Sequence, residues 1–289
     1  MGIAVQLLLN GIIAGAIYAL VALGFNLIYG ATKFFNLAHG ALTAVGGYAV
    51  FFFAKLLGFS AVAAIPLGIA VAGIIGWLLN LGIYQPLRMR KASNTVLLVA
   101  SLGAFIVIQA LIAILFTSQF QIISQNIGEI KTYEIFGGII TQTQLVILAT
   151  TLAIMAVLAF VLWKTLLGRM IRAISDDAEV AAIIGIPAER IIGYVFLIGS
   201  AIAGLGGILV GYETGLEPTM GMSLLLKGVI ASIIGGIGNV FGGVLGAFLL
   251  GFIENFGIWK IAGQWKDAIA FGVLILFLLF RPQGILRRR

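Results

Sequence analysis

The sequence predicts an all-α, polytopic membrane protein, and its composition and patterning support this fold class. Of the 289 residues, 62% are hydrophobic and only 9% are charged, whereas roughly a quarter of the residues in an ordinary soluble domain are charged. So few charged side chains cannot cover the surface of a soluble globule. The apolar residues also form long stretches that have the length of membrane-spanning helices.

Eight apolar stretches are candidates for membrane spans, because a helix needs about 20 mostly apolar residues to cross the hydrocarbon core. They cover residues 3–29, 36–57, 60–83, 94–116, 143–163, 191–211, 222–257 and 266–281. The seventh is too long for one span and is interrupted by the glycine-rich run Gly235–Gly243, so we expect two short or re-entrant helices there. The sequence therefore predicts about eight or nine transmembrane helices in a single domain over residues 1–289.

Lysine and arginine are concentrated in short segments between the apolar stretches, which is typical of cytoplasmic loops. These segments are the loop with Arg88, Arg90 and Lys91, the segment 164–190, and the C-terminal tail with Arg281 and Arg287–Arg289. This distribution explains the net charge of +7 without a nucleic-acid partner. It predicts a cytoplasmic C-terminus and places two acidic loops outside, around Glu129 and Glu134 and around Glu213 and Glu217.

The N-terminal side of the membrane stays open at this stage. Lys33 and Lys55 do not favour either side. The first apolar stretch lacks the basic region of a cleavable signal peptide and continues past the usual length of such a signal, so we expect it to be retained as a span.

Catalytic and metal-binding chemistry has little support in the residue inventory. The chain contains no cysteine, one histidine and ten acidic residues, so neither a zinc-thiolate site nor another metal site is predicted. It has neither the G-x-x-x-x-G-K-[ST] phosphate-binding motif nor a G-x-S-x-G nucleophile motif. We therefore expect no catalytic residues, no cofactor held by this chain, and a function other than that of an enzyme.

The longest segment expected in the cytoplasm contains a predicted short helix. Asp176 is expected to be its N-cap, and Glu179 follows three residues later, which is the capping-box spacing. Asp177 and Glu179 both complement the positive end of the helix dipole. At the other end, Gly185 can take a left-handed conformation and Pro187 prevents the helix from continuing.

Alanine residues form most of the body of this helix, at Ala178, Ala181 and Ala182. Two helical turns are not stable alone in water. Because an alanine-rich face has little side-chain bulk, one interpretation is that the helix inserts into a groove of another protein. The alternative is an amphipathic connector that rests on the membrane surface, and the residues alone leave both interpretations open.

The run E-V-A-A-I-I-G at residues 179–185 resembles the E-A-A-x-x-x-G coupling segment of ABC importer permeases, with one inserted residue. The resemblance extends to GIIAGAIYALVALGFNLIYGATKFFNLAHGALTAVGGY near the N-terminus, and to LLLKGVIASIIGGIGNVFGGVLGAFLLGFIENF and FRPQGIL near the C-terminus. These stretches are similar to the branched-chain amino acid permeases of the LivH type, to which the urea and short-amide permeases are related.

The resemblance implies a permease domain that works in a complex. Its partners would be a homologous LivM-like permease, two cytoplasmic ATPases that hold ATP and Mg²⁺, and an external substrate-binding protein. This assembly would move branched-chain or related hydrophobic amino acids inward across a bacterial or archaeal plasma membrane. The residues that would transmit ATPase movement are Asp176, Asp177, Glu179, Ala181, Ala182, Gly185 and Ile186.

Two groups of residues are candidates for the substrate pathway. The first is Asn36, His39 and Gly40, at the start of the second apolar stretch. A packing or helix-start role for His39 is favoured over a pathway role, and proton relay is disfavoured because no carboxylate lies nearby in sequence. Asn36 is also a possible N-cap. The second group is Gly235, Gly236, Gly238 and Asn239.

The glycine-rich group has two interpretations. The ends of broken helices can offer backbone amides to a substrate carboxylate, whereas the alternative is a tight turn between two short helices. Glu254 lies among apolar residues near the end of the same stretch, and we expect it close to the membrane interface.

Alternative functions remain at this stage. A urea or short-amide ABC permease is the nearest alternative. An ATP-independent carrier or channel is less favoured, because a coupled carrier needs charged residues near the middle of its spans and only Lys227 and Glu254 qualify. An intramembrane enzyme is disfavoured by the missing catalytic motifs.

Overall fold

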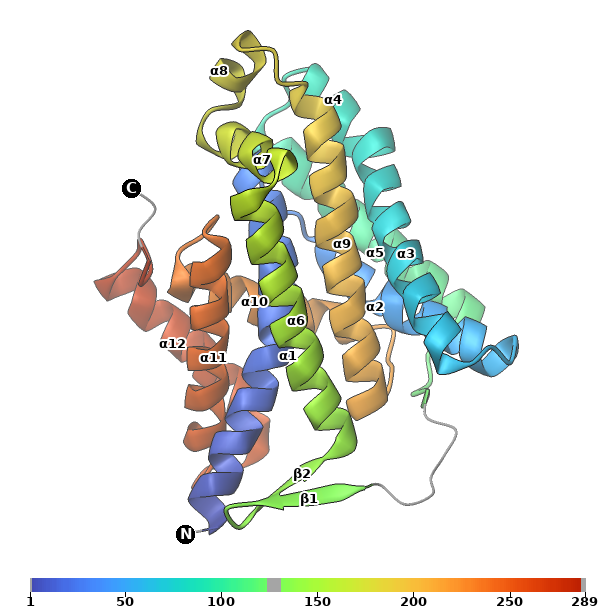
Figure 1. Ribbon diagram of the computed structural model, residues 1–289, viewed down its shortest axis with the longest axis vertical. Coiled ribbons are helices and arrows are strands. Elements are labelled where there is room, and N and C mark those ends of the chain that lie inside the picture. The colour runs from blue at the N-terminus through green and yellow to red at the C-terminus, as the bar shows by residue number, and fades with distance from the viewer. Residues whose placement is uncertain (1, 124–130, 287–289) are drawn as a thin grey trace.

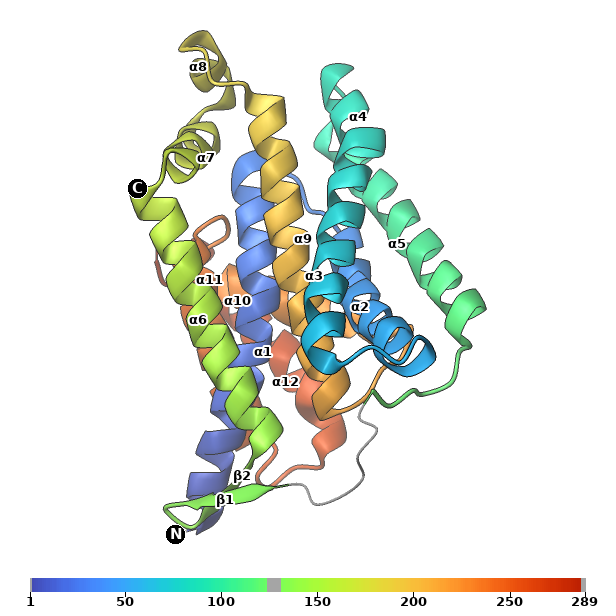
Figure 2. The same cartoon turned by 45° about the vertical axis from the view of Figure 1, so that its right-hand side comes forward.

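The computed structural model describes residues 2–123 and 131–286, which form an almost entirely helical bundle (Figures 1 and 2). Glu129 and Arg287–Arg289, assigned above to an outer loop and the cytoplasmic tail, lie outside the described residues. The elements in chain order are α1 (Gly2–Thr32), α2 (Ala38–Phe51), η1 (Phe52–Leu56), α3 (Ala61–Leu79), η2 (Asn80–Tyr84), α4 (Gln85–Met89), α5 (Asn94–Phe116), β1 (Thr132–Ile135), β2 (Gly138–Thr141), α6 (Gln142–Lys164), α7 (Leu166–Asp176), α8 (Ala178–Ile183), α9 (Ala188–Glu213), α10 (Met220–Gly235), α11 (Val240–Gly257), η3 (Gly263–Trp265) and α12 (Lys266–Phe280).

Seven helices of the described chain are long and apolar enough to cross a membrane. Helix α10, with 16 residues, is shorter, whereas α2 continues directly into the π turn η1. At 1.5 Å of rise per residue α10 is only about 24 Å long, less than the hydrocarbon core of about 30 Å. The expected polytopic all-α fold is therefore confirmed, and the long seventh stretch forms the separate helices α10 and α11, as the glycine-rich interruption predicts.

The third stretch continues further than expected. Its helix was predicted to end near residue 83, but the π-helical turn η2 carries it into α4, which ends at Met89. The π turn lies directly before Pro86, a residue that lacks an amide hydrogen and disrupts a regular α-helix. As a result Arg88, expected in a loop, lies on a helix.

A β-hairpin precedes α6 and was not expected from the sequence. Strands β1 and β2 pair antiparallel, with Thr132 opposite Thr141. Phe136 and Gly137 form the turn with φ values of 51° and 82°, the positive-φ pair of a tight hairpin turn. The hairpin lies at the same end of the molecule as the start of α1 (Figure 1), and the Gln6 side chain bonds both the amide and the carbonyl of Ile139, at 2.8 and 3.1 Å.

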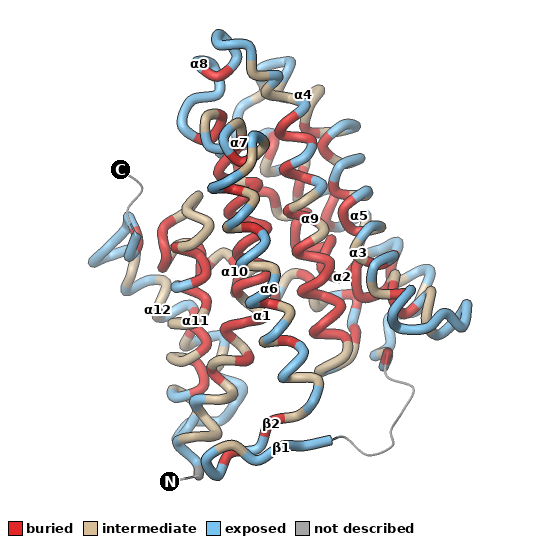
Figure 3. The backbone as a smooth tube through the Cα atoms, in the orientation of Figure 1, coloured by how far each residue is buried: buried red, intermediate tan, exposed pale blue. Residues whose placement is uncertain are grey.

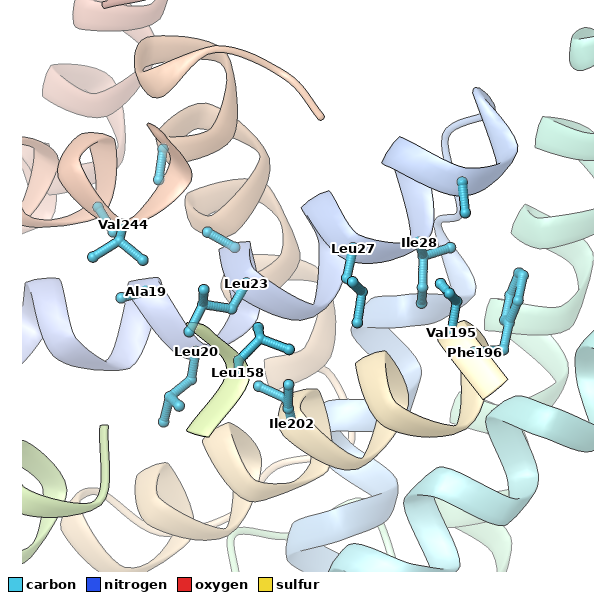
Figure 4. Close-up of a cluster of buried hydrophobic side chains, with 14 of the residues drawn as sticks. Ala19, Leu20, Leu23, Leu27, Ile28, Leu158, Val195, Phe196, Ile202 and Val244 are labelled. Carbon is cyan, nitrogen blue, oxygen red and sulfur yellow. The ribbon is translucent and has the colours of Figure 1, made fainter. Parts of the chain in front are cut away.

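The core lies around α1 and α9, which are buried along most of their length (Figure 3). Helix α1 packs against α11, α9 and α10, and α9 also packs against α2 and α3. Figure 4 shows the centre of this packing, where Leu20 and Leu23 of α1 lie near Ile202 of α9, and Ile28 of α1 lies near Val195 of α9. The outer faces of α3, α5, α6 and α12 are exposed and apolar, as expected for helices in contact with lipid or another membrane chain.

Glycine residues allow α1 and α11 to approach closely. A Cβ atom added at Gly251 would lie only 2.6 Å from the backbone nitrogen of Gly15. Such contacts matter in a membrane, because lipid tails are as apolar as the side chains and helix association depends on close packing. The small residues therefore set the distance between these two helices.

Replacing Gly251 with valine tests this packing. We expect a loss of about 1–3 kcal/mol of stability, the usual effect of overpacking a close contact. The measurement is thermal unfolding of the purified protein in detergent. Gly103→Val is the matched control, because a Cβ at Gly103 meets no atom within 4 Å; equal melting temperatures for the two variants would contradict the proposed contact.

Candidate functional site

Helix α8 begins one residue later than predicted. Asp177, not Asp176, is its N-cap, because the Asp177 Oδ1 atom accepts hydrogen bonds from the amides of Glu179 and Val180, at 2.9 and 3.0 Å. Asp176 instead forms the last residue of α7. Glu179 is consequently only two residues after the cap, so the expected capping box is not formed. The backbone amide of Asp177 bonds the carbonyl of Ala173.

The end of α8 agrees with the sequence prediction. Gly185 has a φ of +87°, and its amide bonds the carbonyl of Ala182 at 3.0 Å, while the amide of Ile186 bonds the carbonyl of Ala181 at 3.0 Å. These two bonds form a Schellman motif, which uses a left-handed residue to satisfy the final carbonyls of a helix. The direction in which the chain leaves α8 is therefore fixed by the backbone.

The exposed face of α8 is aliphatic rather than bare alanine. Ala181 is buried against the protein, whereas Val180, Ile183 and Ile184 have exposed fractions of 54%, 83% and 69%. Figures 1 and 2 place this helix beyond the ends of α6 and α9. A cluster of exposed aliphatic side chains at such a position is characteristic of a contact surface.

Two cationic side chains connect the ends of this coupling segment, α7 to the start of α9, to the rest of the bundle. Lys33, in the connection between α1 and α2, donates from Nζ to the carbonyl of Ser175 in α7, at 2.6 Å. Arg88 of α4 forms a bidentate pair with Glu189 in the first turn of α9, at 2.6 and 3.2 Å. Arg88 also donates to Asn80 at 2.8 Å. Sequence analysis missed both connections, because neither pair is local in sequence.

Asn36 and His39 are fully inside the protein. Asn36 accepts a hydrogen bond from the Tyr84 hydroxyl at 3.0 Å and does not cap α2. His39 Nε2 lies 3.3 Å from the carbonyl of Val21, and no described carboxylate forms an ion pair with it. Both side chains are buried, and the role of His39 stays a prediction. Gly40 permits close approach to α10, since a Cβ there would lie 2.8 Å from the Leu225 Cβ.

The glycine-rich turn contacts a different part of α1. Asn239 caps α11 by accepting from the amide of Gly242 at 3.0 Å. The amide of Gly238 donates to Asn26 of α1 at 2.8 Å, and Asn26 also bonds Ser232. The tail pairs with the same turn, where Leu286 donates to the carbonyl of Gly235 at 3.0 Å. The Gly238 and Gly242 amides are therefore engaged within the chain, and the turn lines a cavity of about 210 Å³ next to α7.

The φ values at this turn explain its glycines. Gly236 and Gly238 have φ values of 111° and 79°, which side chains with a Cβ rarely adopt. Gly235 has no such φ, but a Cβ on it would collide with the backbone of Gly242. These observations favour the tight-turn interpretation over exposed substrate-binding amides.

Glu254 belongs to a buried ionic network. It lies in the last turn of α11, near the helix end as expected, but its carboxylate faces the protein interior and its exposed fraction is 0%. Lys227 of α10 pairs with Glu254 at 2.5 Å and with Asp267 of α12 at 2.8 Å. The Tyr18 hydroxyl of α1 donates to Glu254 at 2.7 Å. Tyr18 and Asp267 were not identified from the sequence, because the pattern does not show which helices are neighbours.

No group of three or more potential metal-binding His, Cys, Asp or Glu side chains occurs in the parts of the chain that the structure describes. The arrangement instead provides a contact surface at one end, an ion pair and a lysine–carbonyl hydrogen bond behind it, and a polar network inside the bundle. A multi-pass helical bundle with a projecting short contact helix is the arrangement expected of a membrane permease subunit.

Comparison with known proteins gives the family. Residues 7–278 match the family described as "Branched-chain amino acid transport system / permease component". The chain is 33% identical to the permease BraD of Pseudomonas aeruginosa and 32% identical to LivH of Escherichia coli K12, in each case over 98% of this chain and 95% of the relative. A probable LivH of Methanocaldococcus jannaschii is 26% identical over 97% of this chain and 92% of the relative. The chain belongs to this permease family and is a permease subunit of an ABC importer.

The fold is also similar to that of a solved structure. PsaBC from Streptococcus pneumoniae in complex with Fab aligns with a TM-score of 0.50 over 98% of this chain and 93% of that chain, at 13% sequence identity. At this identity the likeness concerns the fold alone. Permeases of this family are transport components rather than enzymes, and they work with ATPase and binding-protein partners.

The Schellman glycine gives one testable prediction. Gly185→Leu forces a branched side chain into a left-handed conformation, which costs about 1–2 kcal/mol of conformational free energy. We therefore expect ATP-driven uptake to fall several-fold, while the permease stays inserted and ATP hydrolysis continues. Uptake and hydrolysis are measured in the same vesicles containing the complete transporter. Gly185→Asn is the control, because asparagine tolerates this conformation; wild-type uptake by the leucine variant would refute the role of Gly185.

The Arg88–Glu189 pair gives a second prediction. Arg88→Gln and Glu189→Gln should each reduce the uptake rate, and the uptake rate of the double variant should not fall below that of the slower single variant. The expected coupling energy between Arg88 and Glu189 is about 1 kcal/mol. The readout is a double-mutant cycle on uptake rates. Arg90→Gln, an exposed neighbour on the same segment, should leave uptake unchanged. Simple additivity of the two single effects would show that the pair does not act as a unit.

Proposed function

We propose that this chain forms one half of the translocation pathway of an importer for branched-chain or related hydrophobic amino acids. The observation that carries the proposal is the exposed aliphatic face of α8, in a chain that is similar to BraD and LivH over nearly its full length. A LivM-like permease would form the other half. Two cytoplasmic ATPases would bind ATP and Mg²⁺, and an external binding protein would deliver the substrate.

The orientation follows from charge. The end of the molecule that carries α8 also carries the basic residues Arg90, Lys91, Lys164, Arg169, Arg172 and Arg190. Because basic residues accumulate on the cytoplasmic side, the proposal assigns α8 to the cytoplasm, and the basic Arg281 supports a C-terminal tail on the same side. The start of α1 and the β-hairpin lie at the opposite end (Figure 2), which is the outer side. The proposed location is the plasma membrane of a bacterium or archaeon.

The mechanism assigns α8 to receive the movement of the ATPases. Val180, Ile183 and Ile184 would pack in a groove of an ATPase, and the Asp177 cap and the Gly185 motif keep the short helix formed. Movement of α8 would pass through Ser175 and Lys33 to the junction of α1 and α2, and through Glu189 and Arg88 to α4. The bundle would then alternate between outward and inward access.

The experiment that tests this function combines purification with transport. The tagged chain is extracted gently from its native membrane, and we expect a homologous permease and ATPases with phosphate-binding loops to co-purify in stoichiometric amounts. Reconstituted vesicles should take up radiolabelled leucine, isoleucine or valine only with ATP and binding protein present. Uptake of urea or short amides instead of these amino acids would show that the chain is a urea or short-amide permease. A chain that purifies alone and transports without ATP would contradict the importer.

A further inference from the structure

A second cavity, of about 320 Å³, lies at the end of the bundle opposite α8. Its wall contains Gln144 at the start of α6, next to the β-hairpin, and Glu213 at the end of α9 (Figure 1). Its other polar lining residues are Asn10 and Tyr18 of α1, Thr214 directly after α9, Asn255 of α11 and Lys266 of α12. With Leu224 of α10, the lining comes from six helices, and the cavity has the size of a site for one small molecule.

Opposite charges face this cavity. The Gln144 Nε2 atom donates a hydrogen bond to Oε1 of Glu213 at 2.7 Å, and no other described residue donates to this carboxylate. The second carboxylate oxygen is therefore free to accept a hydrogen bond from a ligand. The Lys266 ammonium group forms no hydrogen bond or ion pair with any described residue. One available carboxylate and one available ammonium group therefore line the same small space.

The buried ionic network holds one side of the cavity in place. Tyr18 lines the cavity and donates to Glu254, and Lys227 bridges Glu254 and Asp267. Lys227 is already paired with two carboxylates and is not available to a ligand. Lys266 is therefore the cation that a ligand in the cavity can bind. Because side chains that are fixed before binding lose little entropy when a ligand arrives, such a wall favours recognition.

The remaining lining is aliphatic. Ile13, Ile17, Val210 and Leu224 line the same cavity as the two charged groups. A carboxylate, an ammonium group and an aliphatic surface are the three complements of an aliphatic amino acid in its zwitterionic form. A neutral amide such as urea would leave both charges unpaired and the aliphatic surface unused.

We infer that this outer cavity binds the zwitterion of an aliphatic amino acid, with its ammonium group at Glu213 and its carboxylate at Lys266. The inference rests on the proposed function for the identity of the substrate and adds where the permease first holds it. In this arrangement the amino acid meets the chain on the outer side before passing through the bundle.

The test is direct binding of L-leucine to the purified transporter complex in nanodiscs, without binding protein, followed by saturation-transfer NMR of the leucine methyl groups. Glu213→Gln and Lys266→Met should each weaken binding at least about tenfold, the effect of losing one charged hydrogen bond. Two matched controls are Glu217→Gln, in the connection between α9 and α10, and Lys260→Met, in the connection between α11 and α12. Both change exposed charges that do not line the cavity, so both variants should bind leucine as the wild type does.

Two leucine analogues separate recognition from folding damage. 3-Methylbutylamine lacks the carboxylate, so Lys266→Met should not weaken its binding further; 4-methylpentanoate lacks the ammonium group and should be insensitive to Glu213→Gln. Equal affinity of leucine for wild type and both variants, or an equal loss in the controls, would overturn the inference.

The same preparation distinguishes this inference from the proposed function. ATP-driven leucine uptake by a complex whose binding is insensitive to Glu213 and Lys266 would refute the cavity and leave the importer intact. Charge-dependent leucine binding without ATP-driven uptake would support the cavity and refute the importer.

Discussion

The close approach of α1 to its neighbours is the constraint on which the rest of the bundle depends. Gly15 lies against Gly251 of α11, and Gly24 lies against His39 of α2 and Gly199 of α9. In a membrane, where burial from water supplies no drive between helices, such contacts hold the helices together through close packing. A helix so tightly surrounded offers few positions for polar side chains, and Tyr18 and Asn26 are both hydrogen-bonded to neighbouring helices.

The polar residues of α1 lie at successive levels of the bundle. Near the middle of the helix, Tyr18 contacts the ionic network and the cavity lined by Glu213 and Lys266. Further along, Asn26 holds the glycine-rich turn, and Lys33 follows directly after the helix and bonds α7. One rigid helix therefore connects the proposed amino acid site with the proposed ATPase contact, and a displacement at Ser175 has a continuous physical route to the outer cavity.

The sequence predicted the features that depend on local chemistry. The break between α10 and α11 follows from glycines at positive φ, and the end of α8 follows from Gly185. The N-cap was placed one residue early because Asp176 and Asp177 are equally good caps, and the length of α7 decides between them. The extension of the third span was missed because Pro86 usually marks a helix end, and here a π turn accommodates it.

Features that depend on which helices are neighbours could not be predicted. Lys227 and Glu254 were each noticed as charges in apolar surroundings, but their pairing, and the contribution of Tyr18 and Asp267, needs the packing of four helices. The same holds for Glu213 and Lys266, which are 53 positions apart in the sequence and meet only at the cavity. The hairpin was missed because Phe136, with 92% of its surface exposed, is an unusual residue for a tight turn.

The ion pair between Arg88 and Glu189 depends on the length of the helix that contains the π-helical turn η2. Asn80, Tyr84 and Arg88 follow one another at intervals of four residues and all engage the bundle interior or α9. One residue rotates an α-helix by about 100°. A family member that lost the extra residue of this turn would carry the same side chains in the same order. Its arginine would nevertheless point away from α9, because the helix after the turn would be rotated. The contact between Arg88 and Glu189 therefore depends on the number of residues in this helix as well as on the two side chains.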